Sequence, residues 1–100
     1  MLSPEELEQF HTHGFLFLKD ALTATQLKRL TEQFDLWKEQ SRSQTAAYGE
    51  TIDGRPRFDI EPGHCAERPA LRRIASPVEI SDVYLEVMRD NRALDAVVDI

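Results

Sequence analysis

Apolar residues recur at helical spacing near the start of the chain until a stop signal interrupts them. Ser3 can cap a first helix, with Pro4 at its first position and Glu6 completing a capping box. Gly14 can adopt the left-handed conformation that commonly closes a helix. This pattern predicts a helix over residues 4–13.

The same start signal then occurs a second time. Thr23 is placed as the N-cap of the next helix, and Gln26 is its capping-box partner. Large apolar residues follow at helical spacing: Leu27, Leu30, Phe34 and Trp37. We expect an amphipathic helix over residues 24–40.

The segment between these two helices is short and apolar. The run FLFL occupies residues 15–18, between Gly14 and the charged pair Lys19 and Asp20. A short apolar run bounded in this way is typical of a buried strand. We therefore predict a strand over residues 15–18.

The periodic pattern fails after the second helix. Residues 41–57 contain two glycines, a proline and scattered polar residues, which predicts a long loop of the kind that forms lids or binding segments. Short strands are expected at residues 57–60 and 70–75. Capping residues and helical spacing then predict helices over residues 82–90 and 92–100. The fold class expected from this order is α+β.

Composition narrows the classes of protein that the chain can belong to. The net charge of −6 and the pI of about 5.0 argue against a non-specific grip on nucleic acid or on an anionic membrane surface. One cysteine, Cys65, excludes an intramolecular disulfide. The N-terminus is polar and acidic, unlike a secretory signal, and no apolar run approaches the length of a membrane span. These features predict a cytoplasmic protein without a nucleic-acid or membrane partner.

The histidines are poor candidates for a metal site. His11 and His13 would point to nearly opposite sides of a helix, and a histidine in the last helical turn interacts favourably with the helix dipole. Glu61 and His64 have the Glu-x-x-His spacing of di-iron bundles, but the Pro-Gly pair between them forbids the required helix. His64 and Cys65 are adjacent, which favours a surface or packing role. We expect no metal ligand in this chain.

Arginines are the residues that best suit a binding role. Arg55, Arg57, Arg72 and Arg73 fall in or after the long loop, and a guanidinium binds carboxylates and phosphates well. The alternative is a solvated surface with acidic neighbours, where isolated ion pairs contribute little.

Three stretches resemble the N-terminal part of the phytanoyl-CoA dioxygenase family. They are LSPEELEQFHTHGFLFLKDALTATQLKRL, LRRIASP and YLEVMRDNRALDAVVDI. The family cadence is a short helix ending in His-Gly-Phe/Tyr, an apolar strand, and a helix opening with Leu-Thr/Ser-x-x-x-Leu. Residues 13–27 follow this cadence closely, whereas Asn91 stands where the family usually has proline, and residues 44–67 resemble it least.

The resemblance implies an iron(II)- and 2-oxoglutarate-dependent dioxygenase. The family fold is a double-stranded β-helix, a jelly-roll, with N-terminal helices and outer strands packed outside it. Its iron is held by a His-x-Asp/Glu pair and a distant histidine. No His-x-Asp/Glu occurs in residues 1–100. We therefore expect residues 1–100 to be the N-terminal segment of one oxygenase domain, truncated before the barrel core, inactive alone, with the Fe(II) and 2-oxoglutarate ligands beyond Ile100.

In that context the loop at residues 41–57 is expected to cover the mouth of the barrel. Tyr48, Arg55 and Arg57 are its candidate substrate-binding residues, and the substrate is expected to be a small molecule or an acyl compound. Two other interpretations stay open: a non-catalytic helical interaction module that docks a partner through its apolar stripe, and a pseudoenzyme fragment. The oligomeric state is left open too.

Overall fold

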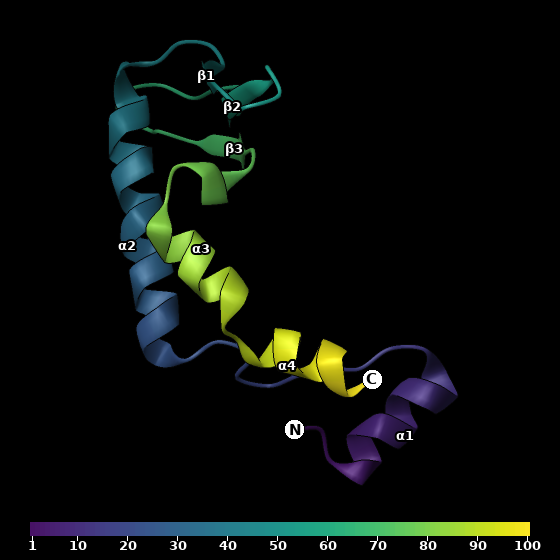
Figure 1. Cartoon of the computed structure of the whole chain (residues 1–100). Coiled ribbons are helices and arrows are strands. Elements are labelled where there is room, and N and C mark those ends of the chain that lie inside the picture. Colours follow the sequence, from purple (N-terminus) through teal and green to yellow (C-terminus); the bar gives the residue numbers. More distant parts are fainter.

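The computed structural model describes all of residues 1–100 (Figure 1). The elements, in chain order, are α1 (Pro4–His13), α2 (Ala24–Gln40), the 3-10 turn η1 (Ser41–Ser43), β1 (Tyr48–Glu50), β2 (Pro56–Ile60), β3 (Leu71–Ile74), the 3-10 turn η2 (Pro77–Glu79), α3 (Asp82–Arg89) and α4 (Arg92–Asp99). The architecture is α+β. The sheet lies at one end of helix α2, and α1 and α4 lie towards its other end (Figure 1).

Both predicted capping boxes are present. Ser3 Oγ accepts from the Glu6 backbone N–H at 3.1 Å, and the Ser3 backbone N–H donates to Glu6 Oε1 at 3.0 Å. Thr23 and Gln26 make the same reciprocal pair at the start of α2. Gly14 ends α1 at φ 78°, and its N–H donates to the Phe10 carbonyl. Short-range chemistry therefore sets the ends of both helices where the sequence places them.

The predicted strand at residues 15–18 is wrong. These residues form an irregular connection with no ladder partner, and Phe15 and Phe17 are 51% and 79% exposed. The sheet lies at the far end of α2 from this segment (Figure 1). A strand needs a neighbour to satisfy its backbone groups, and no strand is within reach here.

The predicted loop at residues 41–57 is wrong in its middle and at its end. It contains β1 and the first residues of β2, which pair as an antiparallel hairpin with Tyr48 opposite Phe58. Gly49 permits the hairpin because it adopts φ 73° and a Cβ there would lie 3.0 Å from Arg57 Cβ. β1 has only three residues, one of them this glycine, so no periodic pattern reveals it.

The rest of the sheet follows the expected elements. β2 begins one residue before the strand predicted at residues 57–60, and β3 is one residue shorter at each end than the strand predicted at residues 70–75. The strands pair antiparallel in the order β1-β2-β3. A register irregularity lies between Asp59 and Ile60. α3 and α4 occupy the ranges predicted as the last two helices, and Ser81 and Asn91 cap them through side-chain acceptors.

One aromatic cluster joins α2 to the sheet and to α3. Trp37 is 5% exposed, and its ring meets Phe58 edge-on at 5.9 Å and Tyr84 at 5.3 Å between centroids. Tyr48 stacks on Phe58 at 4.7 Å. Aromatic pairs in these geometries stabilise contacts by about 0.5–1.5 kcal/mol beyond their burial. This aromatic cluster (Trp37, Tyr48, Phe58 and Tyr84) is the centre of the packed region.

Arg57 is buried at the same end of the molecule and binds several of its segments. Its guanidinium donates to the carbonyls of Ala75 and Ser76 at 3.1 and 2.8 Å and to the carbonyl of Glu50 at 3.0 Å. Glu79 Oε1 lies 2.8 Å from the same guanidinium. Arg57 is 5% exposed, so one buried cation ties β1, β2 and the turn after β3 together.

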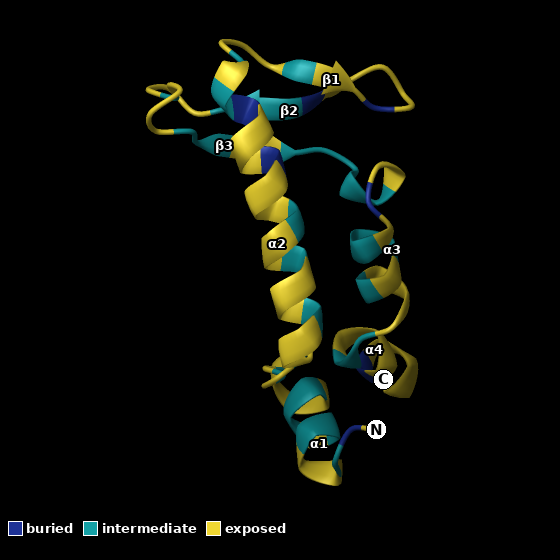
Figure 2. Cartoon of the chain, turned by 90° about the vertical axis from the view of Figure 1, so that its left-hand side faces the viewer, coloured by how far each residue is buried: buried dark blue, intermediate teal, exposed yellow.

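The ends of the chain lie side by side (Figures 1 and 2). The Leu2 backbone N–H donates to Asp99 Oδ2 at 2.7 Å, and Arg92 Nη2 contacts Glu6 Oε2 at 3.1 Å. Polar contacts thus hold α1 against α4, and little apolar surface is buried between them: Leu2 and Ala96 are the buried apolar residues in this half.

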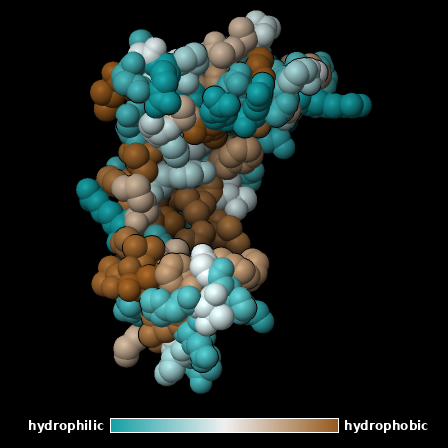
Figure 3. Space-filling view, turned by 90° about the vertical axis from the view of Figure 1, so that its right-hand side faces the viewer, coloured by the Kyte–Doolittle hydropathy of each residue, from teal (hydrophilic) through white to brown (hydrophobic).

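The molecule is extended for its size. Its radius of gyration is 17.3 Å, whereas a compact chain of 100 residues has about 13 Å. Seven of the residues are buried, and most of the ribbon in Figure 2 has the yellow of exposed residues. Large apolar side chains are among the exposed ones, and brown, apolar atoms gather across the middle of the face in Figure 3. No helix has the length and apolar character needed to cross a membrane.

We expect Arg57→Ala to lower the free energy of unfolding by about 3 kcal/mol, because three partly buried carbonyls and the Glu79 carboxylate lose their contact with the guanidinium. Chemical denaturation of the full polypeptide that the gene encodes measures this loss. Arg68→Ala is the matched control, since Arg68 is exposed and its side chain makes no hydrogen bond or ion pair. Equal effects of the two substitutions would contradict the structural role of Arg57.

Candidate functional site

The structure separates the three predicted substrate-binding residues. Tyr48 lies in the aromatic cluster, with its ring on Phe58. Its hydroxyl is buried and has no hydrogen-bond partner, the one such side-chain atom in the chain. Burial raises the pKa of Tyr48, so the hydroxyl stays protonated at neutral pH and could donate to an acceptor.

Arg57 is committed to the chain itself. Its terminal nitrogens already bind three carbonyls and Glu79, inside the packed region. These bonds give Arg57 a structural role, and its contact with substrate stays a prediction.

Arg55 alone is presented to solvent. The turn that carries it is held by hydrogen bonds from the Thr51 N–H to the Arg55 carbonyl at 2.8 Å and from the Arg55 N–H to Thr51 Oγ1 at 3.0 Å. Arg55 Nε donates to both carboxylate oxygens of Asp53, at 2.9 and 3.1 Å. Hydrogen bonds from Thr51 and then from Arg55 lower the pKa of Asp53, which keeps this carboxylate ionised. Arg55 is therefore positioned before any ligand arrives.

A cleft of about 250 Å³ lies beside Arg55, and we call it the sheet cleft. Its lining residues are Ala47, Arg55, Pro56, Asp59, Arg73 and Ala75. Asp59 and Arg73 are cross-strand partners next to the Phe58–Ile74 pair. Side chains alternate along a strand, so Asp59 and Arg73 leave the sheet on the face away from the aromatic cluster.

Some charged groups of the sheet cleft have ion-pair partners within the chain, and others have none. Asp59 lies 3.9 Å from Arg72, and Arg55 shares its Nε edge with Asp53. The Arg73 guanidinium has no hydrogen bond or ion pair, and no partner holds the terminal nitrogens of Arg55. Two arginine side chains with free donors therefore border one small cleft that alanine and proline also line.

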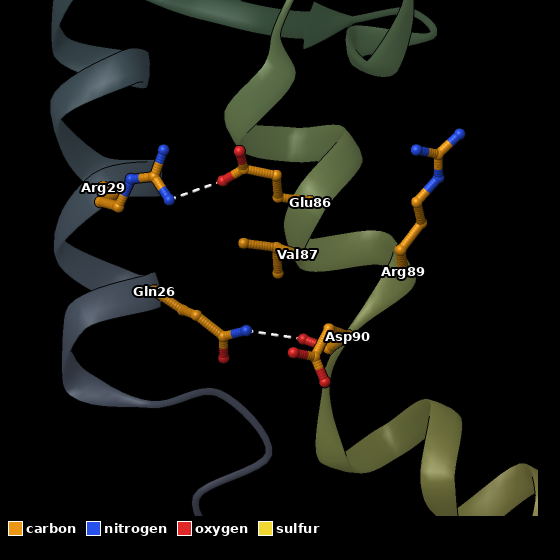
Figure 4. A pocket seen from close by; sticks show the side chains of 6 residues that line it. All are labelled: Gln26, Arg29, Glu86, Val87, Arg89 and Asp90. Atoms are coloured by element: carbon orange, nitrogen blue, oxygen red, sulfur yellow. Dashed lines mark hydrogen bonds and ion pairs between the residues drawn. The ribbon is translucent and has the colours of Figure 1, made fainter.

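A larger cleft of about 400 Å³ lies between α2 and α3 (Figure 4). Its polar groups bind one another: Arg29 Nη1 lies 2.6 Å from Glu86 Oε2, and Gln26 Nε2 donates to the Asp90 carbonyl at 2.6 Å. Arg89 points away from the other labelled side chains (Figure 4). These contacts make the larger cleft an inter-helix junction in which Arg29 and Gln26 already have partners.

The histidines serve local structure. His11 and His13 lie in the last turn of α1. His64 accepts from the Ala70 N–H through Nδ1 at 2.8 Å, and its Nε2 lies 2.9 Å from the Ser41 carbonyl. His64 thus connects the segment before β3 to the end of α2. No three His, Cys, Asp or Glu side chains gather in an arrangement that could hold a metal ion.

Arg73 is the cleft residue that sequence reasoning did not select for substrate binding. It stood among the four arginines with suitable chemistry, but its place beside Arg55 depends on the register of β2 with β3. The run LRRI at residues 71–74 does not distinguish its two arginines, because the register irregularity beside Asp59 interrupts the alternation and Arg72 also lies 3.9 Å from the Asp59 carboxylate.

Comparisons with known proteins found no match. No family model, no curated protein and no solved structure matches the chain.

We expect Tyr48→Phe to raise the free energy of unfolding by about 1 kcal/mol, because it removes a buried hydroxyl that lacks a partner. Denaturant unfolding of the gene-encoded polypeptide measures the change. Tyr84→Phe is the control, as Tyr84 belongs to the same aromatic cluster and has no unsatisfied buried hydroxyl. If Tyr48→Phe instead destabilises the protein, its hydroxyl has a partner that this structure does not contain.

Proposed function

We propose that residues 1–100 are the N-terminal part of an Fe(II)- and 2-oxoglutarate-dependent dioxygenase that hydroxylates a small-molecule or acyl substrate. The resemblance of residues 13–27 and of the last helices to the phytanoyl-CoA dioxygenase family motivates the proposal. In it, α1 to α4 and the small sheet are the outer layer of a double-stranded β-helix. The reaction itself belongs to residues outside this segment.

The observation that carries the proposal is the amount of surface left uncovered, together with the large apolar side chains that belong to it. The accessible surface is 7242 Å², whereas a folded monomer of 11.5 kDa exposes about 5,800 Å². The excess is larger than the roughly 800 Å² that one partner contributes to a standard interface. A layer that packs on the outside of a larger core has this property, and a self-contained domain does not.

The exposed apolar side chains are distributed along the whole molecule. They lie in the connection after α1, on α2, at the tip of the β1–β2 turn, on α3 and on α4. The large ones are Met1, Phe15, Phe17, Leu27, Phe34, Leu36, Ile52, Ile80, Met88, Leu94, Val97, Val98 and Ile100. Such an arrangement supports contact with extensive further polypeptide more than it supports one local binding patch.

Residues 1–100 do not fit the iron that the proposal requires. No cluster of potential ligands exists among them, and the His-x-Asp/Glu pair of the family is absent. The part that the proposal gives to this chain is therefore to support the barrel and to contact substrate, and Arg55 is the predicted substrate residue still available for that contact.

We expect the full gene-encoded polypeptide to bind Fe(II) and 2-oxoglutarate together. An anaerobic titration that follows the visible charge-transfer absorption of an iron(II)–2-oxoacid chelate needs no knowledge of the substrate. Under oxygen, release of succinate should depend on Fe(II), stop with a chelator and resume when Fe(II) is restored. Absence of both the absorption and succinate release, in a folded preparation, would contradict the oxygenase proposal.

A helical interaction module is the second candidate function. The observation in its favour is that α2 exposes Leu27 by 58% and Leu36 by 53%. It predicts that the gene-encoded polypeptide forms a stoichiometric complex through α2 and binds no 2-oxoglutarate. Leu27→Glu would then abolish complex formation without altering the helix content measured by circular dichroism.

A further inference from the structure

We propose that the sheet cleft binds a small oxyanion, namely a carboxylate or phosphate group of a ligand, between Arg55 and Arg73. This assignment concerns binding alone and does not depend on the proposed function. It names a site and the chemical class of its ligand from the placement of two guanidinium groups around one concave surface.

Both arginines of the sheet cleft have donors that bind nothing within the chain. Arg55 is held by its turn and uses Nε for Asp53, so its two terminal nitrogens face no partner within the chain. Arg73 has no partner at all. A guanidinium presents paired donors that match two oxygens of a carboxylate or phosphate, and charge-assisted hydrogen bonds of this type are about twice as strong as neutral ones.

The charges around the sheet cleft do not cancel. Asp59 also lines it and would repel an anion, but Arg72 lies 3.9 Å from the Asp59 carboxylate. Asp53 lies on the Nε side of Arg55 and is not among the lining residues. With Asp53 and Arg72 both counted, three arginines face two carboxylates, so one positive charge remains to favour an anion.

The sheet cleft is small, and part of its lining is apolar. Ala47, Pro56 and Ala75 are small and apolar, which leaves room between the arginines and lowers the local polarity around them. The volume of about 250 Å³ is below the roughly 300–1,000 Å³ of sites that enclose a whole drug-sized ligand. The sheet cleft therefore suits the charged end of a ligand.

The inter-helix cleft shows why charge alone is not the criterion. It is larger and contains two arginines, but Glu86 binds Arg29 at 2.6 Å and Arg89 points away (Figure 4). An anion there would have to displace an existing carboxylate. At the sheet cleft no such displacement is needed at Arg73.

The test is a titration of the gene-encoded polypeptide with inorganic phosphate and, separately, with acetate, at constant ionic strength. Nuclear magnetic resonance of the arginine Nε–Hε groups reports each guanidinium directly and needs no catalytic activity. We expect saturable shifts of the Arg55 and Arg73 signals. The anion that saturates at lower concentration distinguishes a phosphate-bearing from a carboxylate-bearing ligand.

Variants decide whether the binding is specific. Arg73→Gln should weaken binding at least about tenfold, which corresponds to the loss of one charge-assisted hydrogen-bonded contact. Arg73→Lys should keep the charge, lose the paired donors and give an intermediate affinity. Arg68→Gln removes an exposed arginine outside the sheet cleft and should leave the affinity unchanged.

Three results would overturn the assignment. They are shifts that rise linearly without saturation, equal weakening by Arg68→Gln and Arg73→Gln, and saturable binding that persists in Arg73→Gln. Amide spectra of each variant show whether its fold is retained. Because the Arg73 side chain is exposed and makes no hydrogen bond or ion pair, both of its variants should keep the spectrum of the parent.

Discussion

Trp37 occupies the only place where a helix, the sheet and a second helix meet around one side chain. Its indole contacts Phe58 of β2 and Tyr84 of α3, and Tyr48 extends the stack to β1. Arg57 binds carbonyls at the end of β1 and just after β3. Away from this region the elements are joined mainly by polar contacts, such as those of Glu6 with Arg92 and of Arg29 with Glu86. Exposed ion pairs of that kind contribute little to stability.

This distribution concentrates most of the buried residues at the sheet end of the molecule. A side chain can hold a ligand in a fixed geometry only where the backbone beneath it is fixed, and the aromatic cluster together with Arg57 fixes β2 and β3. Arg55 and Arg73 project from that region. The exposed apolar side chains of α2 and α4, such as Leu27 and Val98, by contrast have no counterpart within the chain, and this uncovered surface is what the proposed place in a larger oxygenase fold accounts for.

Local interactions made much of the fold predictable from the sequence. Ser3 with Glu6 and Thr23 with Gln26 are contacts across three residues, so the starts of α1 and α2 can be read directly. The run at residues 15–18 misled because burial was inferred from apolar character, although Phe17 is 79% exposed. β1 and the neighbourhood of Arg73 depend on strand pairing across distant positions, which no short pattern encodes. For the same reason the sequence predicted one substrate site for Tyr48, Arg55 and Arg57, whereas the structure places these residues in three different environments.

The central claim is that residues 1–100 are a layer whose apolar faces require further polypeptide to cover them. Thermal unfolding of this 100-residue chain alone, followed by calorimetry and by the near-ultraviolet signal of Trp37, tests it most directly. We predict a broad, weakly cooperative loss of signal, because little apolar surface is removed from water to offset the conformational entropy of the chain. A single sharp transition with an enthalpy of about 70 kcal/mol, the value typical of a complete domain of this length, would contradict the claim.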